Sequence, residues 1–265
     1  MIKLRVFALL CAGLITSGCQ TVAVSDFKLD GQVSANVYKA SNTPAPTILV
    51  SHGSDCVTDH HLGWANLLSS NGFNAVVVNH CQEKGLVRHT GKVKVETAPE
   101  ARVKDLMTTA NWVLSQPWHS GKVGVIGFSQ GGSGVNLLGN TTMMQRFKIV
   151  SDISELSHFG AFVSYYPGCG IPGGTTPDLP YAPFMMHLAE LDGLSEIQWC
   201  QAGFRKNENL TIHTYKGVHH AFDVVGMNAS GQVGPYRRHY RSLYDPNADK
   251  LSRQRTIDFF NAQLR

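Results

Sequence analysis

The ten-residue stretch VGVIGFSQGG, from Val123 to Gly132, decides the fold that we predict for this chain. A short apolar run leads into a serine between glycines, and small residues follow it at the start of a predicted helix. This pattern places Ser129 on a tight corner between a strand and a helix, with its hydroxyl lifted clear of the backbone. Gly127 and Gly131 stand where such a corner leaves no room for bulky side chains. The stretch matches G-x-S-x-G, so Ser129 is a candidate nucleophile.

The rest of the chain alternates short apolar runs with amphipathic segments. The runs predict strands at 47–53, 74–80, 122–128, 159–167, 183–190 and 210–215. Helices are expected around 62–70, over 98–117, from 130, over 195–204 and over 249–263. Apolar strands separated by helices predict an α/β fold with a mostly parallel central sheet and helices on both faces. Ligands bind such sheets at the carboxyl ends of the strands.

Domain boundaries follow from composition. The chain has 265 residues, 43% hydrophobic and 16% charged, and no composition break or internal repeat divides it. We expect one domain over 31–265, preceded by a polar linker at 19–30. The longest stretch without predicted helix or strand, 222–246, is too long for a passive connection and is expected to border a binding cleft.

A serine hydroxyl needs a base to take its proton and a carboxylate to orient that base. The fold predicts the chain order serine, acid, histidine, with the last two on loops after later strands. Glu190 and Asp192 follow one strand, and we prefer Asp192 because it lies farther beyond the strand, beside a glycine. His219 and His220 follow the next strand. Neighbours in an extended segment point opposite ways, so only one of them faces Ser129, and spacing does not select it.

A second strand end predicts an oxyanion hole. The run ending in SHGSDC leaves its strand into a glycine loop, where this fold supplies one of two backbone amides for the oxyanion. We assign that role to the amides of Gln130 and Ser54. His52, at the end of the strand, is expected to hold the loop, and His187, inside a strand, is expected to be a hydrogen-bonded core histidine.

The first residues predict export. Lys3 and Arg5 precede an apolar run that ends in small residues and Cys19, which is the pattern of a signal peptide over residues 1–18. The run is too short to span a bilayer. The sequence ITSGC resembles the lipobox of bacterial lipoproteins, which implies lipid attachment at Cys19 and anchoring to a membrane surface. The alternative is a cleaved signal peptide that leaves the protein soluble in the periplasm.

Cysteine usage agrees with export. One cysteine lies in the predicted leader and Cys19 directly after it, which leaves four in the mature chain. Four thiols in an exported chain are typical of two disulfides, although they allow three connectivities. We expect the pairs Cys56–Cys81 and Cys169–Cys200, because each would join loops that follow neighbouring strands.

Neither a metal, a cofactor nor nucleic acid is expected as a partner. The candidate zinc ligands besides these cysteines are His60, His61, His80, His219 and His220. Their spacings match no recognised zinc site. The formal net charge of +4 falls to +2 when residues 1–18 are removed, because Lys3 and Arg5 leave with them. So small an excess does not favour nucleic acid.

Over most of the chain from Thr47 onward, these motifs resemble the dienelactone hydrolase family, which has the α/β-hydrolase fold. The segments HGS, GFSQGG, LAELDG and YKGVHHAFD stand in the family's order and approximate separations. The family's base directly precedes Ala-Phe, which selects His220, and its acidic loop selects Asp192. The family's name-giving members use a cysteine nucleophile where this chain has Ser129. The resemblance therefore implies general ester hydrolysis.

The expected function is that of a serine hydrolase acting on small carboxylic esters or lactones through an acyl-enzyme. A peptidase or amidase with the same triad is one alternative, because pocket shape sets that specificity. A non-catalytic binding lipoprotein is the other.

Overall fold

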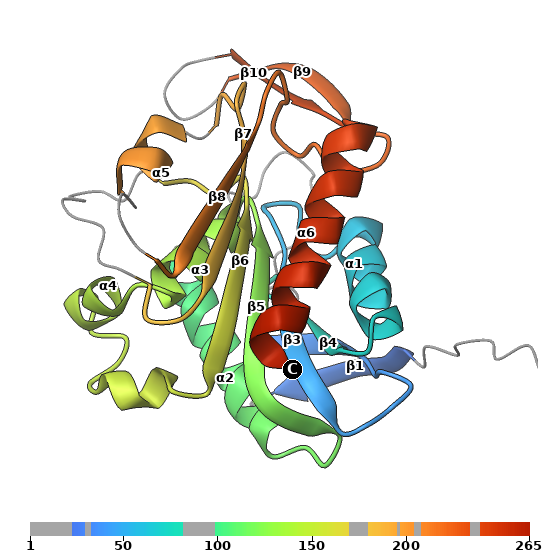
Figure 1. Ribbon diagram of the computed structural model, residues 1–265, viewed down its shortest axis with the longest axis vertical. Coiled ribbons are helices and arrows are strands. Elements are labelled where there is room, and N and C mark those ends of the chain that lie inside the picture. Colours follow the sequence, from blue (N-terminus) through green and yellow to red (C-terminus); the bar gives the residue numbers. More distant parts are fainter. Residues whose placement is uncertain are drawn as a thin grey trace, which may run out of the picture.

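The computed structural model describes residues 23–29, 33–81, 99–169, 180–194, 197–203, 208–233 and 239–265, so the predicted leader and Cys19 lie outside the described residues. Over these residues the main sheet has eight strands in the order β1-β2-β4-β3-β5-β6-β7-β8 (Figure 1). The strands are β1 (Ala23–Leu29), β2 (Val33–Tyr38), β3 (Ala45–Ser51), β4 (Asn74–Asn79), β5 (His119–Phe128), β6 (Phe159–Tyr165), β7 (Phe184–Ala189) and β8 (Leu210–Tyr215). Strands β3 to β8 run parallel, and β2 is antiparallel to both its neighbours. The predicted, mostly parallel sheet is confirmed.

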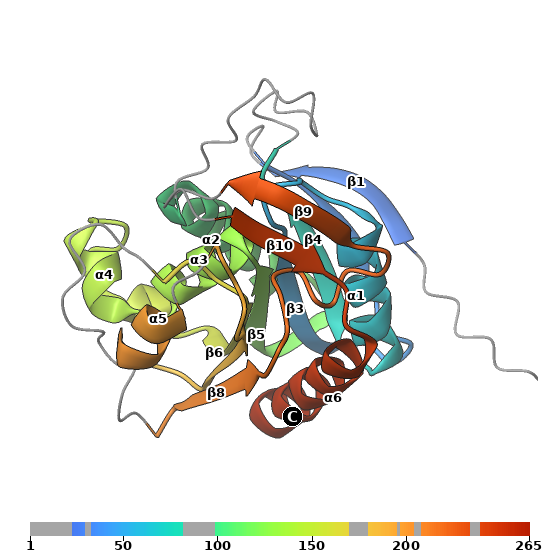
Figure 2. The same ribbon diagram turned by 90° about the horizontal axis from the view of Figure 1, so that it is seen from above.

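Helices cover both faces of this sheet, as Figures 1 and 2 show. The helices are α1 (Asp59–Ser70), α2 (Pro99–Leu114), α3 (Gln130–Leu138), α4 (Thr141–Arg146), α5 (Ile197–Gly203), α6 (Pro246–Leu264) and the 3-10 turn η2 (Ile153–Leu156). Helices α2 and α3 pack in one hydrophobic core, and α1 and α6 pack in the other. The helices predicted over 98–117 and 249–263 are α2 and α6, the latter beginning three residues earlier than expected.

The strand that leads to Ser129 separates these two cores. Val123 and Val125 of β5 lie in the core under α2 and α3, whereas Ile126 and Phe128 lie in the core under α1 and α6. All four are at most 1% exposed. Side chains of a strand alternate between faces, and a strand covered on both faces is therefore apolar throughout. This double burial fixes the end of β5, and with it the corner at Ser129.

The order in which strands are added to the sheet changes at β3, although β3, β4 and β5 all run parallel. From β3 the chain passes through α1 to β4 on one side, and α2 then carries it back across to β5 on the other side. The segment after β3 leads to α1 on one face of the sheet, and the segment after the neighbouring β5 leads to α3 on the other face. In α/β sheets, ligands bind at the carboxyl edge beside such a switch point. Ser51 at the end of β3 lies in register with Gly127 of β5. The fold thus brings the loop with Ser54 beside Ser129.

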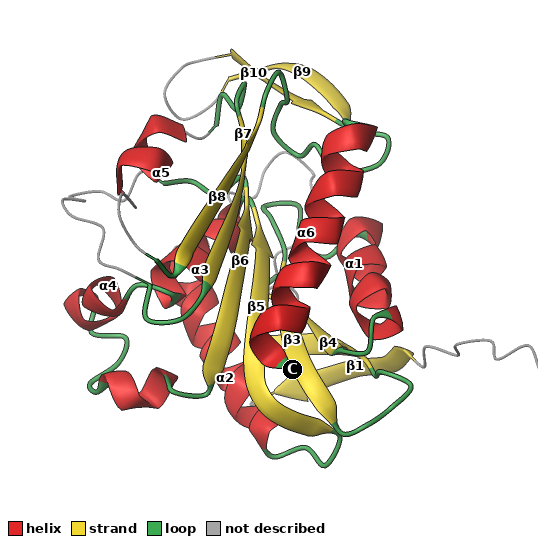
Figure 3. Cartoon of the chain, viewed as in Figure 1, coloured by secondary structure: helices red, strands yellow, loops and turns green. Residues whose placement is uncertain are grey.

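Several elements were not predicted from the sequence. Residues 23–29, part of the expected linker, form β1 and pair with β2, which was also not predicted. The stretch 222–246, expected to be irregular, contains an antiparallel hairpin of β9 (Asn228–Val233) and β10 (His239–Leu243) (Figure 3). The polar sequence NASGQV of β9 has no apolar alternation, so nothing in its pattern indicates a strand. Seen from above, the hairpin lies across the carboxyl ends of the parallel strands (Figure 2).

Two disulfides fasten loops at this same edge. Cys56 is bonded to Cys81, and Cys169 to Cys200, which confirms the expected pairing. The first bond joins the loop after β3 to the end of β4, and the second joins the segment after β6 to α5. Within the part of the chain that the structure describes, no helix combines the length and apolarity needed to cross a bilayer.

Candidate active site

Ser129 occupies the corner between β5 and α3 and has a φ of 52° and a ψ of −115°. A residue other than glycine with such a backbone costs about 1–3 kcal/mol and persists only where its surroundings hold it. Its amide donates to the carbonyl oxygen of Tyr165 at 3.0 Å, and its carbonyl oxygen accepts from the amide of Ser133 at 3.0 Å. These bonds to β6 and α3 hold the strained corner predicted from the sequence.

The glycines beside Ser129 are required by close backbone packing. A Cβ on Gly131 would overlap the carbonyl oxygens of Ser51 and His52 at the end of β3. A Cβ on Gly127 would overlap the backbone of Gly131. Because these obstacles are backbone atoms, no side-chain movement relieves them. The two glycines therefore let three chain segments meet at the serine.

Three side chains from distant parts of the chain form one hydrogen-bonded line at the carboxyl edge. His220 Nε2 lies 3.1 Å from Ser129 Oγ, and His220 Nδ1 lies 2.7 Å from Asp192 Oδ2. An ionised carboxylate only accepts, so Nδ1 carries a proton and the neutral ring accepts from the serine hydroxyl through Nε2. Asp192 and His220 are 8% and 6% exposed, so little water competes for these bonds. The arrangement suits removal of the hydroxyl proton.

The other acid and the other histidine lie elsewhere. Glu190 Oε2 accepts from the amide of Gly217 at 2.8 Å and so stabilises the turn before the histidines. The half-buried His219 has no partner for Nδ1 within the described residues. Neither is in the hydrogen-bonded line of Ser129.

His220 is held on its backbone and on its ring. The amide of Leu243, at the end of β10, donates to the carbonyl oxygen of His220 at 3.1 Å, and Ser242 forms a parallel bridge with it. The ring packs against Tyr166, with 4.6 Å between the ring centroids. The hairpin that the sequence did not reveal thus supports the candidate base.

Both candidate oxyanion donors lie near Ser129. Gln130 is the first residue of α3, where helix amides lack partners within the helix and the helix dipole favours negative charge. Ser54 is exposed in the turn after β3, and a Cβ on its neighbour Gly53 would lie 3.5 Å from the Cβ of Ser129.

Sequence reasoning missed a buried arginine beneath this loop. Arg102 of α2 is 0% exposed and donates to the carbonyl oxygens of His52 at 2.6 Å and Gly53 at 3.2 Å, and to Gln130 Oε1 at 3.2 Å. Burial lowers the pKa of Arg102 to about 10, against the opposing effect of Asp105, so it is charged at neutral pH. An arginine in an amphipathic helix normally indicates the solvated face, and no sequence pattern marked this one.

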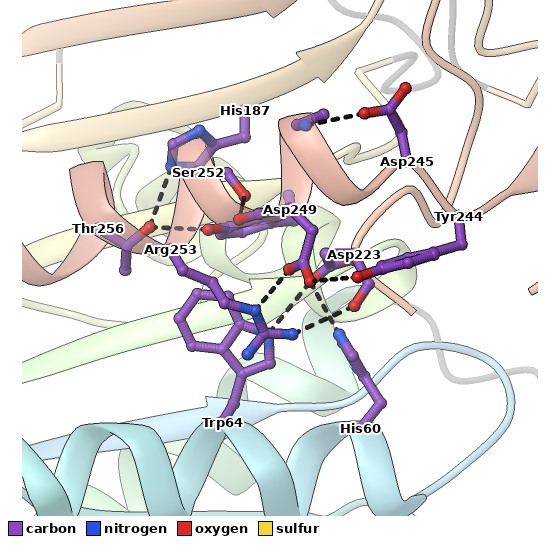
Figure 4. Close-up of polar contacts among 12 residues, drawn as sticks. His60, Trp64, His187, Asp223, Tyr244, Asp245, Asp249, Ser252, Arg253 and Thr256 are labelled. Carbon is purple, nitrogen blue, oxygen red and sulfur yellow. Dashed lines mark hydrogen bonds and ion pairs between the residues drawn. The ribbon is translucent and has the colours of Figure 1, made fainter. Parts of the chain in front are cut away.

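The two histidines that we expected to be structural are buried and hydrogen-bonded. His52 donates from Nδ1 to the carbonyl oxygen of Gly53 at 2.6 Å and accepts at Nε2 from the amide of His80 at 3.0 Å. His187 pairs with the hydroxyl of Tyr215 at 2.8 Å. It also pairs with the hydroxyl of Thr256 at 3.0 Å (Figure 4). Burial holds the pKa of His187 well below its usual range.

A second buried carboxylate lies three residues beyond His220. Asp223, 0% exposed, accepts from Tyr166 Oη at 2.6 Å, His60 Nε2 at 2.8 Å and Trp64 Nε1 at 3.0 Å. Arg253 donates to its carbonyl oxygen and lies over the Trp64 ring (Figure 4). The network ties the His220 loop to α1, β6 and α6. No group of three or more side chains suited to a metal occurs within the described ranges.

The arrangement of strands, helices and serine corner places the protein in a known class. Its fold matches solved α/β-hydrolases over most of its length. Residues 33–264 match the model of the Dienelactone hydrolase family, and the chain belongs to that family. It is accordingly a dienelactone hydrolase-like hydrolase.

Individual relatives are distant in sequence and similar in fold. The chain is 28% identical over 244 residues to an Azospirillum brasilense protein named "Putative carboxymethylenebutenolidase", covering 89% of this chain and 95% of that protein. A dienelactone hydrolase-like promiscuous phosphotriesterase from metagenomic libraries superposes with a TM-score of 0.66 at 14% identity, covering 91% of this chain and 97% of that one. Est1E from Butyrivibrio proteoclasticus, with ferulic acid bound, superposes with a TM-score of 0.58 at 12% identity, covering 91% and 99%.

Proposed function

We propose that the protein cleaves small carboxylic esters or lactones through a Ser129-His220-Asp192 triad. The single observation that carries the proposal is the unbroken line from Asp192 through His220 to Ser129, at 2.7 and 3.1 Å. Ser129 Oγ attacks the carbonyl carbon while His220 Nε2 takes its proton, and Asp192 stabilises the imidazolium. The carbonyl oxygen becomes an oxyanion held by the amides of Gln130 and Ser54.

Collapse of this intermediate completes the first half of the reaction. The carbon–oxygen bond to the leaving group breaks, His220 gives that oxygen its proton, and an acyl group stays on Ser129. Water then attacks the acyl group with His220 again as base, which releases the carboxylic acid. Family membership supports ester chemistry, and so does Est1E, whose bound ferulic acid is a carboxylic acid.

A fluorophosphonate probe tests this function, because it bonds only to an activated serine. We expect labelling and hydrolysis of p-nitrophenyl acetate by the wild type and by Ser115→Ala, which alters an exposed serine at the end of α2. Ser129→Ala should show neither. Absence of labelling in folded wild type would reject the enzyme mechanism in favour of a binding protein, and hydrolysis of peptides but not esters would assign the triad to a peptidase.

We also propose that the chain is exported and lipid-anchored through Cys19. The signal-like residues 1–18 and the lipobox-like ITSGC support this, and the two disulfides are typical of an oxidising compartment. Bacteria fed radiolabelled palmitate should label the wild type but not Cys19→Ser. If the wild type is not labelled and is found in the periplasmic fraction, the proposed lipid anchor is wrong and the protein is soluble in the periplasm.

A further inference from the structure

The loop after β3 contains the peptide group that joins Gly53 to Ser54. A trans peptide is planar, so the N–H of Ser54 points opposite to the C=O of Gly53. Whatever holds that carbonyl oxygen therefore also sets the direction of the amide. Because Gly53 lies against Ser129, this direction decides whether the amide reaches an oxygen bonded to the carbon that Ser129 attacks.

Two buried side chains hold the Gly53 carbonyl oxygen. Arg102 Nη2 donates to it at 3.2 Å, and His52 Nδ1 donates to it at 2.6 Å. Arg102 Nη1 also donates to the carbonyl oxygen of His52 at 2.6 Å. The guanidinium thus fixes two successive peptide groups of the loop, and both side chains are 0% exposed.

The same guanidinium binds the side chain of Gln130, whose backbone amide is the other candidate donor. Arg102 Nη2 lies 3.2 Å from Gln130 Oε1, at the start of α3. Its stem packs on α3, since a Cβ on Gly134 would lie 3.2 Å from the Cβ of Arg102. A guanidinium has five N–H donors in a fixed plane, which suits several fixed acceptors at once. One buried cation therefore links the two segments that carry the candidate amides.

His52 is itself held in the required tautomer. Its Nε2 accepts from the amide of His80, so Nδ1 carries the proton that binds Gly53. His80 Nδ1 in turn donates to Asp105 Oδ2 at 2.8 Å, one turn after Arg102 in α2. Both holders of the carbonyl thus connect back to α2.

We propose that Arg102 is a positioning residue of the oxyanion hole, which turns the Ser54 amide toward Ser129 by holding the Gly53 carbonyl. This rests on the proposed function, because it explains how one of its two donors is aimed. Without the guanidinium only His52 holds the Gly53 carbonyl oxygen, so the Ser54 amide is aimed less accurately at the oxygen that gains charge in the transition state. Such a loss lowers kcat and leaves KM nearly unchanged.

The test compares Arg102→Met, which keeps most of the stem, with Arg102→Lys, which keeps the charge. With p-nitrophenyl acetate, we expect kcat to fall about 10- to 100-fold in Arg102→Met, less than the loss of a whole donor costs. KM should change by less than about twofold. Arg102→Lys should lie between Arg102→Met and the wild type, because an ammonium lacks the planar fork.

A second readout reports on the oxyanion itself. Ser129 Oγ adds to the carbonyl carbon of a carbon-13-labelled trifluoromethyl ketone, its proton passes to His220, and the ketone oxygen becomes an anion in the same hole. NMR titration of the labelled carbon gives the pKa of that oxygen, which correctly aimed donors lower. This pKa should be higher in Arg102→Met than in the wild type, a change that general loss of stability does not produce.

Thr109→Val is the matched control, because Thr109 is also 0% exposed in α2 and its hydroxyl donates to the carbonyl oxygen of Asp105 at 2.8 Å. It should leave kcat and the oxyanion pKa unchanged. A folded Arg102→Met with wild-type kcat and oxyanion pKa would overturn this proposal alone; if that variant does not fold, the same result in Arg102→Lys does so. Wild type that forms no adduct would overturn the proposed function first, and this inference with it.

Discussion

The backbone at Ser129 depends on a glycine two residues later. Gly131→Ala would place a methyl group against two carbonyl oxygens of the β3 end, so we expect a loss of about 3 kcal/mol in unfolding free energy and much slower fluorophosphonate labelling. Gly63→Ala is the control, because Gly63 is exposed in α1 with no atom near its Cβ position. The unfolding free energy of Gly63→Ala should rise by about 0.5–1 kcal/mol, because alanine favours a helix more than glycine does. Urea denaturation measures both, and equal stability of the two variants would contradict the packing argument.

Asp192 pairs with the ring of His220, whereas Glu190 accepts a hydrogen bond from the backbone of Gly217. Asp192→Asn should keep the fold and lower kcat about 10⁴-fold, because an amide no longer fixes the tautomer of His220 or stabilises its charged form. Glu190→Gln removes the charge of an exposed acid in the same loop and should change kcat by less than about twofold. Steady-state hydrolysis of p-nitrophenyl acetate measures both. Near-normal turnover in Asp192→Asn would remove that residue from the triad.

The candidate triad could be predicted because each member follows a strand that sequence pattern locates. Ser129 stands in a pattern of fixed spacing, and chain order then restricts the acid and the base to two short loops. Arg102 and Asp223 could not be predicted in this way. Their roles depend on partners 28 to 163 positions away in the sequence, such as Gln130 and His60. A charged side chain in a helix or loop also normally indicates a solvent-exposed position.

At the scale of elements, Asp223 joins α1, β6 and the loop after β8. Burial raises its pKa, but His60, Tyr166 and Arg253 outweigh burial and hold the pKa below its ordinary 3.8. The folded state thus binds this proton less readily than the unfolded chain. The carboxylate therefore stabilises the fold above the unfolded pKa, and this contribution is lost as pH falls through the folded pKa. The melting temperature should fall progressively below about pH 5.

Asp223→Asn tests that assignment. It should cost about 2–4 kcal/mol at pH 7, because an amide replaces a buried anion that accepts three hydrogen bonds. Its stability should also depend less on pH between 3 and 7 than that of the wild type. Asp258→Asn, an exposed change on α6, should reproduce the wild-type pH profile in thermal melts. An Asp223→Asn profile parallel to the wild type would show that another group dominates acid unfolding.

The parallel strands were predictable because burial on both faces makes them continuously apolar. The pair β1 and β2 and the hairpin β9–β10 were not, since their stability depends on pairing partners that local composition does not specify. The hairpin matters for function because the amide of Leu243 binds the carbonyl of His220. Sequence pattern thus predicted the strands that position the candidate triad, and it missed the hairpin that binds the His220 backbone.

For the whole molecule, each disulfide closes a loop at the carboxyl edge, and the paired cysteines are 25 and 31 positions apart in the sequence. The chain-entropy model gives about 3–4 kcal/mol for each bond. We expect the double variant Cys56→Ser/Cys81→Ser to lose that much stability, and also kcat, because Cys56 lies two residues after Ser54. Cys169→Ser/Cys200→Ser serves as the comparison for stability, with urea unfolding as the measurement. If full reduction of both disulfides left the unfolding free energy of the wild type unchanged, the expected stabilisation by these bonds would be wrong.

The dependence of His220 on β10 has a consequence for biosynthesis. A growing chain that stops before residue 239 already contains the proposed nucleophile, base and acid, yet it lacks β10, whose Leu243 amide binds the carbonyl oxygen of His220. Hydrolytic competence should therefore arise only after the final part of the polypeptide has left the ribosome. If the chain is exported unfolded, the cell interior is never exposed to the finished catalyst.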